Sequence, residues 1–128
     1  MITSRKLGIL DPKITFENGY FIAEMPPGFD TNLLLKFMHF EFQEGLIHKN
    51  SIIVHTTGDF LFVPKDLIRI KELLREYSIS SNRKKTAIVA DTKLSRSFVN
   101  TLVNSFKGLP FEQKVFSSMA NAKRWMKE

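Results

Sequence analysis

Two short apolar runs, at residues 51–56 and 86–90, constrain the fold of this chain more than any other feature. Neither run alternates strictly between apolar and polar residues, and continuous short runs of this kind are typical of strands buried on both faces of a sheet. Each run is followed by a turn and then by apolar residues at steps of three and four, which indicates an amphipathic helix. Buried strands that alternate with helices predict a mainly parallel sheet.

The N-terminal part of the sequence predicts a β-hairpin. Two strand-like runs, Ile14–Glu17 and Tyr20–Met25, flank the pair Asn18-Gly19. Asn-Gly is the strongest short hairpin signal, because both residues of the tight turn must tolerate a positive φ. We therefore expect an antiparallel strand at one edge of the sheet, preceded by an irregular segment over residues 1–12.

Four helices are predicted, and capping residues precede three of them. Asp30 offers a side-chain oxygen to a helix that starts near Thr31, and the pairs Asp91-Thr92 and Ser117-Ser118 do the same for two later helices. The tail of the first helix, Phe40–Gln43, also alternates like a strand, so its conformation stays open at this stage. The apolar residues expected to face inward in the later helices are Leu67, Ile70, Leu74 and Tyr77; Leu94, Phe98, Leu102 and Phe106; and Met119, Ala122, Trp125 and Met126.

With a last strand at Phe111–Phe116, the element order becomes β-β-α-β-α-β-α-β-α. A length of 128 residues suits one domain, and no internal repeat is visible. The predicted fold class is therefore α/β: a single-domain β-α superhelix over residues 1–128, with a five-stranded, mostly parallel sheet, an antiparallel N-terminal edge strand and four helices. Each crossover is expected to be right-handed.

Positive charge is concentrated in the second half of the chain. Residues 1–64 carry five Lys and Arg against seven Asp and Glu, a net of −2, whereas residues 65–128 carry fourteen against six, a net of +8. The densest run is Arg83-Lys84-Lys85. Either these residues form solvated helix faces, or they form a surface for anionic lipid, nucleic acid or an acidic protein. A recognition helix and paired aromatic residues on a sheet are both missing, so nucleic acid is the less favoured partner.

Several classes of chemistry lack their sequence signatures. The chain has no cysteine, and its histidines His39, His48 and His55 show no i,i+4 pair. There is no Gly-x-Ser-x-Gly elbow and no phosphate-binding glycine loop. We therefore expect no catalysis, no metal and no cofactor. No apolar run approaches the length of a membrane span or a secretory signal, which favours a cytoplasmic location.

The second half of the sequence carries several recognisable local patterns. They are Lys85–Asp91, Leu94–Phe98, Leu109–Phe116, Ala122 and Arg124–Met126. Together they resemble the SpoIIAA-like branch of the STAS superfamily, whose members typically end in a Val-Phe strand, an alanine and a Trp-Leu or Trp-Met pair. The resemblance covers roughly residues 13–127, and the N-terminal half is similar mainly in layout.

The resemblance implies a parallel β-α core and a non-enzymatic module. STAS members include antagonists of anti-sigma factors, which implies a protein partner. The SpoIIAA-like branch is similar in fold to lipid-carrying CRAL-TRIO domains, which implies a small apolar ligand or a peripheral membrane contact. The antagonists carry a phosphorylatable Ser beside an Asp after the third strand. Here residues 57–65 contain no such pair, so we do not expect that switch, with Thr56 or Thr57 as the alternative acceptors.

The carboxyl ends of the predicted strands supply the first candidate site. Ligands of open parallel sheets bind at this edge, where helix N-termini point their amides. The residues expected there are Thr57, Asp59, Asp91 and Arg96. One interpretation is a site in which helix amides and the Arg96 guanidinium bind an anionic group. The other is that Asp91, Thr92 and Ser118 are ordinary caps and that Arg96 pairs with Asp91 or Asp59.

Phenylalanine is unusually frequent, with twelve in the chain. One cluster combines Phe37, Phe40 and Phe42 with Met38, and a second combines Phe60, Leu61 and Phe62. Core burial is the default for both, and the alternative is an exposed patch that marks a partner, a membrane interface or a lid over an apolar cavity.

The sequence therefore predicts a non-enzymatic STAS-like binding module that acts on a protein partner or a small apolar ligand. Its candidate binding residues are Thr57, Asp59, Phe60, Phe62, Asp91 and Arg96. The alternative is a basic surface that binds an anionic membrane or nucleic acid.

Overall fold

The computed structural model describes residues 12–17, 19–26, 30–45, 51–56, 64–78, 83–105 and 111–128. The strands are β1 (Lys13–Glu17), β2 (Tyr20–Glu24), β3 (Ser51–Thr56), β4 (Lys85–Ala90) and β5 (Glu112–Phe116). The helices are α1 (Thr31–Gln43), α3 (Pro64–Ser78), α4 (Lys93–Ser105) and α5 (Met119–Met126). Residues 1–11 of the expected irregular N-terminal segment lie outside the described residues.

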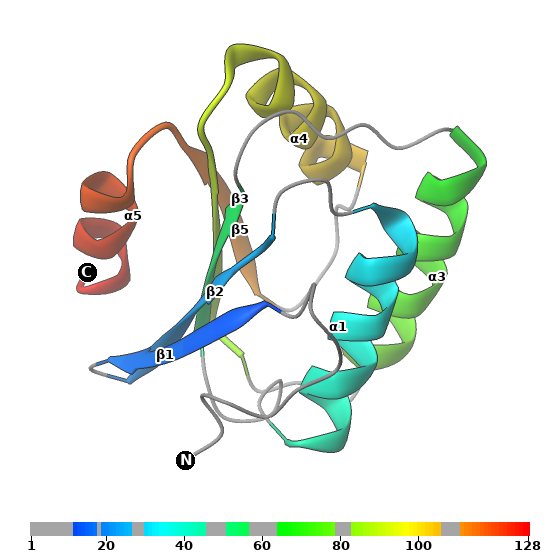
Figure 1. Ribbon diagram of the computed structural model, residues 1–128, viewed down its shortest axis with the longest axis horizontal. Helices are drawn as coiled ribbons and strands as arrows, with labels where there is room; N and C mark the ends of the chain where they lie inside the picture. The colour runs from blue at the N-terminus through cyan, green and yellow to red at the C-terminus, as the bar shows by residue number, and fades with distance from the viewer. Residues whose placement is uncertain are drawn as a thin grey trace.

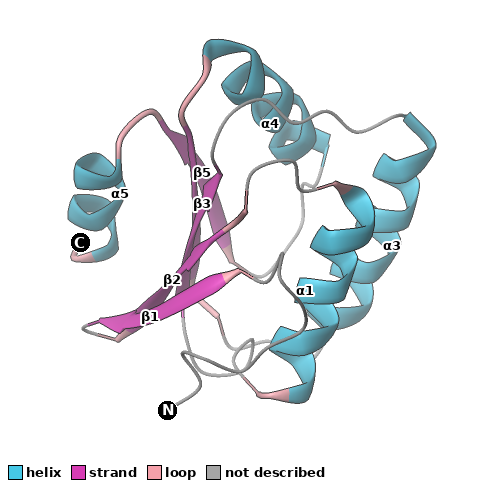
Figure 2. Ribbon diagram, in the orientation of Figure 1, coloured by secondary structure: helices cyan, strands magenta, loops and turns pink. Residues whose placement is uncertain are grey.

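The five strands form one sheet in chain order, β1-β2-β3-β4-β5 (Figure 2). β1 is antiparallel to β2, and every later pair is parallel. The predicted α/β class, with a mostly parallel sheet and an antiparallel N-terminal edge strand, is confirmed, and the described residues contain four helices. The tail Phe40–Gln43, which was ambiguous in the sequence, belongs to α1.

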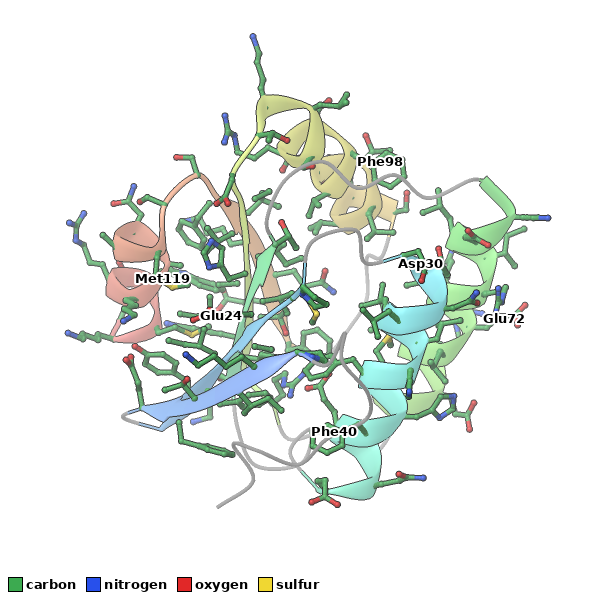
Figure 3. The ribbon with its side chains drawn as sticks, viewed as in Figure 1. Glu24, Asp30, Phe40, Glu72, Phe98 and Met119 are labelled. Carbon is green, nitrogen blue, oxygen red and sulfur yellow. The ribbon has the colours of Figure 1, made fainter. Side chains whose placement is uncertain are left out.

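The helices divide unequally between the two faces of the sheet. Figure 1 shows α1, α3 and α4 on one side and α5 on the other. The three crossovers β2-α1-β3, β3-α3-β4 and β4-α4-β5 advance in one direction across the sheet, so connections of one hand place all three helices on one face. α5 follows the last strand and has no such constraint. Phe40 on α1 and Met119 on α5 mark the two layers in Figure 3.

Two buried clusters fill these layers. The larger lies beneath α1, α3 and α4 and consists of Ile14, Phe21, Ala23, Met25, Phe37, Phe40, Ile52, Ile70, Val99 and Leu102. The smaller lies beneath α5 and consists of Tyr20, Ile22, Ile53, Ala87, Val89, Ala122 and Trp125. Successive side chains of a strand point to opposite faces of the sheet, so neighbouring residues belong to different clusters. Ile52, for example, lies in the larger cluster and Ile53 in the smaller one.

The predicted caps and turns form as the sequence indicates. The backbone amides of Leu33, Ser95 and Asn121 donate to the side chains of Asp30, Thr92 and Ser118, respectively. Gly19 has a φ of 85°, as expected for the hairpin turn, and Gly45 has a φ of 73° just after α1. Side-chain oxygens thus accept hydrogen bonds from backbone amides in the first turn, which have no acceptor within the helix.

One expectation about exposure is wrong. Leu94 was expected on the apolar side of its helix, but its side chain, in the first turn of α4, is 54% exposed. Arg83, at the start of the basic run that leads into β4, is buried, so this residue belongs neither to a solvated helix face nor to a charged surface.

Lys85 and Lys123 both hold α5 in place. The Lys85 ammonium donates to the carbonyl oxygens of Trp125 at 2.7 Å and Glu128 at 2.9 Å, and it lies 5.0 Å from the centre of the Trp125 ring. A cation at the C-terminal end of a helix also complements the helix dipole. Lys123 pairs with Glu17 of β1 at 3.2 Å, which links the hairpin to α5.

Among the described helices, none has the length and apolarity needed to span a bilayer.

The phenol of Tyr20 gives a pH-dependent test of the α5 layer. Burial, followed by the hydrogen bond that Tyr20 donates to Glu17, raises its pKa to about 12. Because the folded-state pKa lies above the unfolded one, this group contributes stability below about pH 10 that is lost as pH rises toward 12. In a spectrophotometric titration of phenolate, the tyrosine removed by Tyr20→Phe should titrate near 12. A value near 10 for that tyrosine would contradict this arrangement.

Candidate functional site

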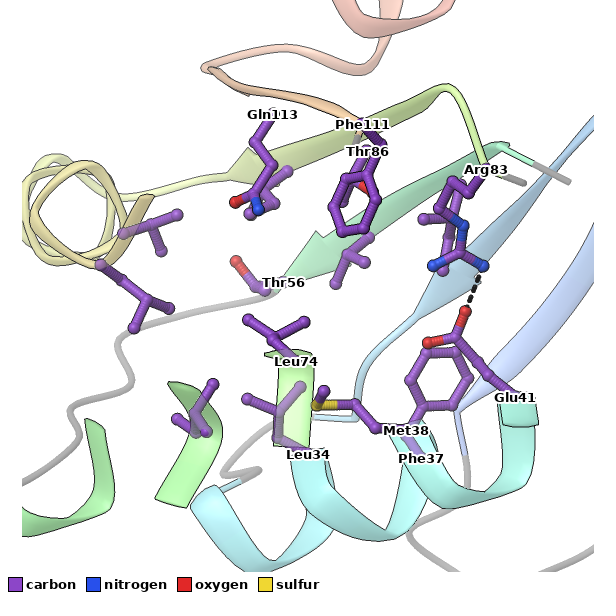
Figure 4. Close-up of a pocket in the computed structure, with 16 residues that line it drawn as sticks. Leu34, Phe37, Met38, Glu41, Thr56, Leu74, Arg83, Thr86, Phe111 and Gln113 are labelled. Atoms are coloured by element: carbon purple, nitrogen blue, oxygen red, sulfur yellow. Dashed lines mark hydrogen bonds and ion pairs between the residues drawn. The ribbon is translucent and has the colours of Figure 1, made fainter. Parts of the chain in front are cut away.

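A cavity of about 110 Å³ lies between the sheet and the layer of α1, α3 and α4 (Figure 4). Its lining is mainly aliphatic and aromatic, with a few polar residues. It comprises Leu34, Phe37, Met38 and Glu41 of α1; Ile70 and Leu74 of α3; Val99 and Leu102 of α4; Ile52, Val54 and Thr56 of β3; Thr86 and Ile88 of β4; Gln113 of β5; and Arg83 and Phe111.

The floor of the cavity consists of every second residue of the parallel strands. The register places Ile52, Thr86 and Gln113 in one row across β3, β4 and β5. The next row carries Val54 and Ile88. Thr86 and Ile88 keep partial exposure although β4 is a central strand, whereas the neighbouring residues on the opposite face of β4 pack under α5. This exposure is consistent with a space that side chains do not fill.

One end of the cavity is closed by a buried ion pair. The guanidinium of Arg83 donates to the carboxylate of Glu41, and both side chains are buried (5% and 6% exposed). Arg83 also lies 5.7 Å from the centre of the Phe21 ring. The pair ties the last turn of α1 to the segment before β4. At the other end of α1, the Thr31 hydroxyl donates to Asp66 of α3 at 2.8 Å. α1 is thus fixed at both ends above the cavity.

The charges of this pair are balanced within the cavity wall. Burial raises the pKa of the Glu41 carboxyl above its ordinary value, and the Arg83 guanidinium opposes that shift. An isolated charge at this depth would be costly, and each partner removes that cost for the other. The described part of the lining therefore presents no net charge to a guest when both groups are ionised.

Two threonines on the floor differ in their hydrogen bonding. The Thr56 hydroxyl donates to the Val89 carbonyl at 3.0 Å. The Thr86 hydroxyl oxygen has an exposed area under 1 Å² and no hydrogen-bond partner among the residues that the structure describes. Most buried polar atoms in folded proteins are paired, so an unpaired hydroxyl beside a cavity needs an explanation.

The predicted rim at the carboxyl ends of the strands is only partly described. His55 and Asp91, from β3 and the end of β4, interact through Nε2 and Oδ1 at 3.1 Å. Arg96 donates to the backbone carbonyls of Ala90 at 2.9 Å and Asp91 at 3.2 Å. Arg96 thus contacts Asp91 through its backbone carbonyl, while the Asp91 carboxylate contacts His55. The other partner expected for Arg96, Asp59, lies outside the described residues.

Four of the six predicted binding residues, Thr57, Asp59, Phe60 and Phe62, lie outside the described residues. Asp91 and Arg96 are brought together at the rim, and neither lines the cavity. In the first aromatic cluster, Phe37 and Phe40 are buried in the larger core. Phe37 and Met38 also line the cavity, so burial in the core and a place in the cavity wall go together in this cluster. The side chain of Phe42 is outside the described residues.

Sequence reasoning missed Glu41 and Arg83. A signal for Glu41 was present, because Leu34, Phe37, Met38 and Glu41 follow the three- and four-residue steps of one helix face. A carboxylate on that apolar face requires a buried cation. Arg83 had no comparable signal, because it precedes β4 in a run of three basic residues and its direction depends on tertiary packing.

Comparisons with protein-family models, with curated proteins and with solved structures found no match for this chain.

The two threonines give a matched prediction of stability. Thr86→Val removes a buried hydroxyl that has no partner, so the free energy of unfolding should rise by about 1–2 kcal/mol. Thr56→Val makes the same chemical change but breaks a buried hydrogen bond, so stability should fall by about 1 kcal/mol. Urea denaturation of both variants measures the difference. Equal losses in both would show that the Thr86 hydroxyl is paired in solution.

The ion pair gives a second prediction. Arg83→Met should lower the free energy of unfolding by about 3–5 kcal/mol at pH 7, because it leaves the Glu41 carboxylate buried without its cation. The double variant Glu41→Leu/Arg83→Met should recover most of that loss.

The loss in Arg83→Met should also shrink as pH falls. Without Arg83 the folded-state pKa of Glu41 rises further, and a group with a raised pKa favours the folded state at low pH and loses that contribution as pH increases. Denaturation curves at several pH values test this. A double variant as unstable as Arg83→Met would contradict the assigned pairing.

Proposed function

We propose that this chain is a non-enzymatic binding module whose cavity takes a small, mainly apolar molecule. The single observation that carries the proposal is the cavity of about 110 Å³ between the sheet and α1, α3 and α4. Small-molecule sites are typically concave, apolar and supplied with a few polar groups, and this lining has that composition. An engineered cavity of about 150 Å³ with an aliphatic and aromatic lining binds benzene, so a guest of about that size suits the space here.

The family resemblance and the geometry support the same proposal. The SpoIIAA-like branch of the STAS superfamily implies a non-enzymatic module with a small apolar ligand as one of its options. Among the described residues that line the cavity, only Glu41 and Arg83 are ionisable, and they are paired with each other. This arrangement favours binding over acid–base chemistry.

A basic surface as the main function has weaker support. Three cations of the positive second half are engaged inside the molecule. Arg83 binds Glu41, Lys85 binds the end of α5, and Arg96 binds the backbone after β4. Glu41 balances the charge of Arg83, and backbone carbonyls hold the side chains of Lys85 and Arg96 in place, so these three cations are less available to an anionic partner and we favour the cavity.

The proposal predicts that benzene stabilises the protein by occupying the cavity. A ligand that binds only the folded state stabilises it by RT ln(1 + [L]/Kd), about 2.7 kcal/mol at one hundred times Kd. Ile88→Phe places an aromatic ring in the same space and should abolish the rise in Tm with benzene. Ile68→Phe makes the same substitution at a site on α3 that is 61% exposed, and should keep the response.

Thermal unfolding of the three proteins at increasing benzene concentration tests the proposal. A wild-type Tm that does not rise with benzene would contradict it. An undiminished response in Ile88→Phe would contradict the location in the cavity.

A further inference from the structure

Two polar side chains stand next to each other on the otherwise apolar floor of the cavity. Thr86 and Gln113 are register partners on the neighbouring strands β4 and β5, and both line the cavity. Within the described part of the chain, neither the Thr86 hydroxyl nor the Gln113 side chain has a hydrogen-bond partner. Figure 4 shows the Gln113 carboxamide extending from β5 toward the space enclosed by the lining.

Other polar groups of the lining differ from this pair because they are already engaged. Thr56 donates to a backbone carbonyl, and Glu41 and Arg83 bind each other. A polar atom of a guest would therefore find unused hydrogen-bonding capacity on the side of the cavity formed by β4 and β5.

We propose that the guest carries one uncharged hydroxyl group on an apolar body of about the size of a benzene ring, and that Thr86 and Gln113 bind this hydroxyl. This inference rests on the proposed function and specifies the class of ligand. A hydroxyl both donates and accepts, as do the Thr86 hydroxyl and the Gln113 carboxamide, so one guest oxygen can pair with both. A carbonyl guest would only accept.

The absence of net charge in the lining sets the charge of the guest. Because Glu41 and Arg83 balance each other, a carboxylate or an ammonium group would add a buried charge without a counterion, which is costly. A neutral hydroxyl needs only hydrogen bonds.

The Thr86 side chain can reach such a guest by a local rotation. Its oxygen has an exposed area under 1 Å², while the residue as a whole keeps partial exposure. No hydrogen bond to a described residue holds its χ1 angle, so a step of about 120° to another staggered rotamer can move the hydroxyl into the position that the methyl group now occupies, while the methyl group moves into that of the Cβ hydrogen. Thr56 lacks this freedom because its hydroxyl is bonded to Val89.

The experiment compares benzene with phenol, which differ by one hydroxyl. Phenol is neutral at pH 7, since a phenolic hydroxyl has a pKa near 10. Calorimetric titration measures the Kd of each compound for the wild type and for Thr86→Val, Gln113→Leu and Thr56→Val. Thr56→Val is the matched control, because it removes a floor hydroxyl that is already engaged.

Phenol should bind the wild type at least as tightly as benzene. In Thr86→Val, phenol should bind about tenfold more weakly, the loss expected for one buried hydrogen bond, while the Kd of benzene stays within about twofold. Gln113→Leu should act in the same direction, and Thr56→Val should keep the wild-type ratio of the two Kd values.

The outcomes separate this inference from the proposal on which it rests. Benzene binding with an unchanged phenol-to-benzene ratio in Thr86→Val would overturn the hydroxyl inference and leave apolar binding in place. A wild type that binds neither compound would overturn both.

Discussion

Alternation along the strands is the constraint on which the rest of this structure depends. Because β2 to β5 run parallel and pair in register, residues of the same parity form rows that face the same side. In β3, β4 and β5, every second residue, such as Ile52, Thr86 and Gln113, lies on the floor of the cavity. The residues between them, such as Ile53 and Ala87, pack beneath α5. A shift of one residue in any strand would exchange these two sets, so the register of the central strands also determines which residues line the cavity.

The buried pair of Glu41 and Arg83 gives this layer its specific geometry. An apolar roof helix can slide over an apolar floor at little cost, whereas a carboxylate at one end of α1 has to meet a single guanidinium. Such a pair contributes little net stability compared with apolar residues of similar size, but separating its members is costly. We interpret it as the device that holds α1 in register above the cavity.

Local patterns in the sequence predicted the fold well and the candidate site poorly. Asn18-Gly19, Asp30, Thr92 and Ser118 act through neighbours a few residues away, so their roles follow from local chemistry. The pairing of Glu41 with Arg83 joins residues far apart in the chain, and the direction of Arg83 depends on packing that no local pattern specifies. The exposure of Leu94 was also not predicted, because the buried face of α4 carries Ser95, Val99 and Leu102, and the choice of that face depends on tertiary packing. The family resemblance indicated a binding module without indicating where in the fold a ligand binds.

The most direct test of the central claim is methyl NMR of the isoleucine residues under xenon, a probe that enters apolar cavities without needing polar contacts. Ile52, Ile70 and Ile88 line the cavity, whereas Ile22 and Ile53 pack beneath α5. We predict saturable chemical-shift changes at the first three methyl groups and little change at the other two. Equal shifts on both faces, or none on either, would contradict a guest-accepting cavity beneath α1, α3 and α4.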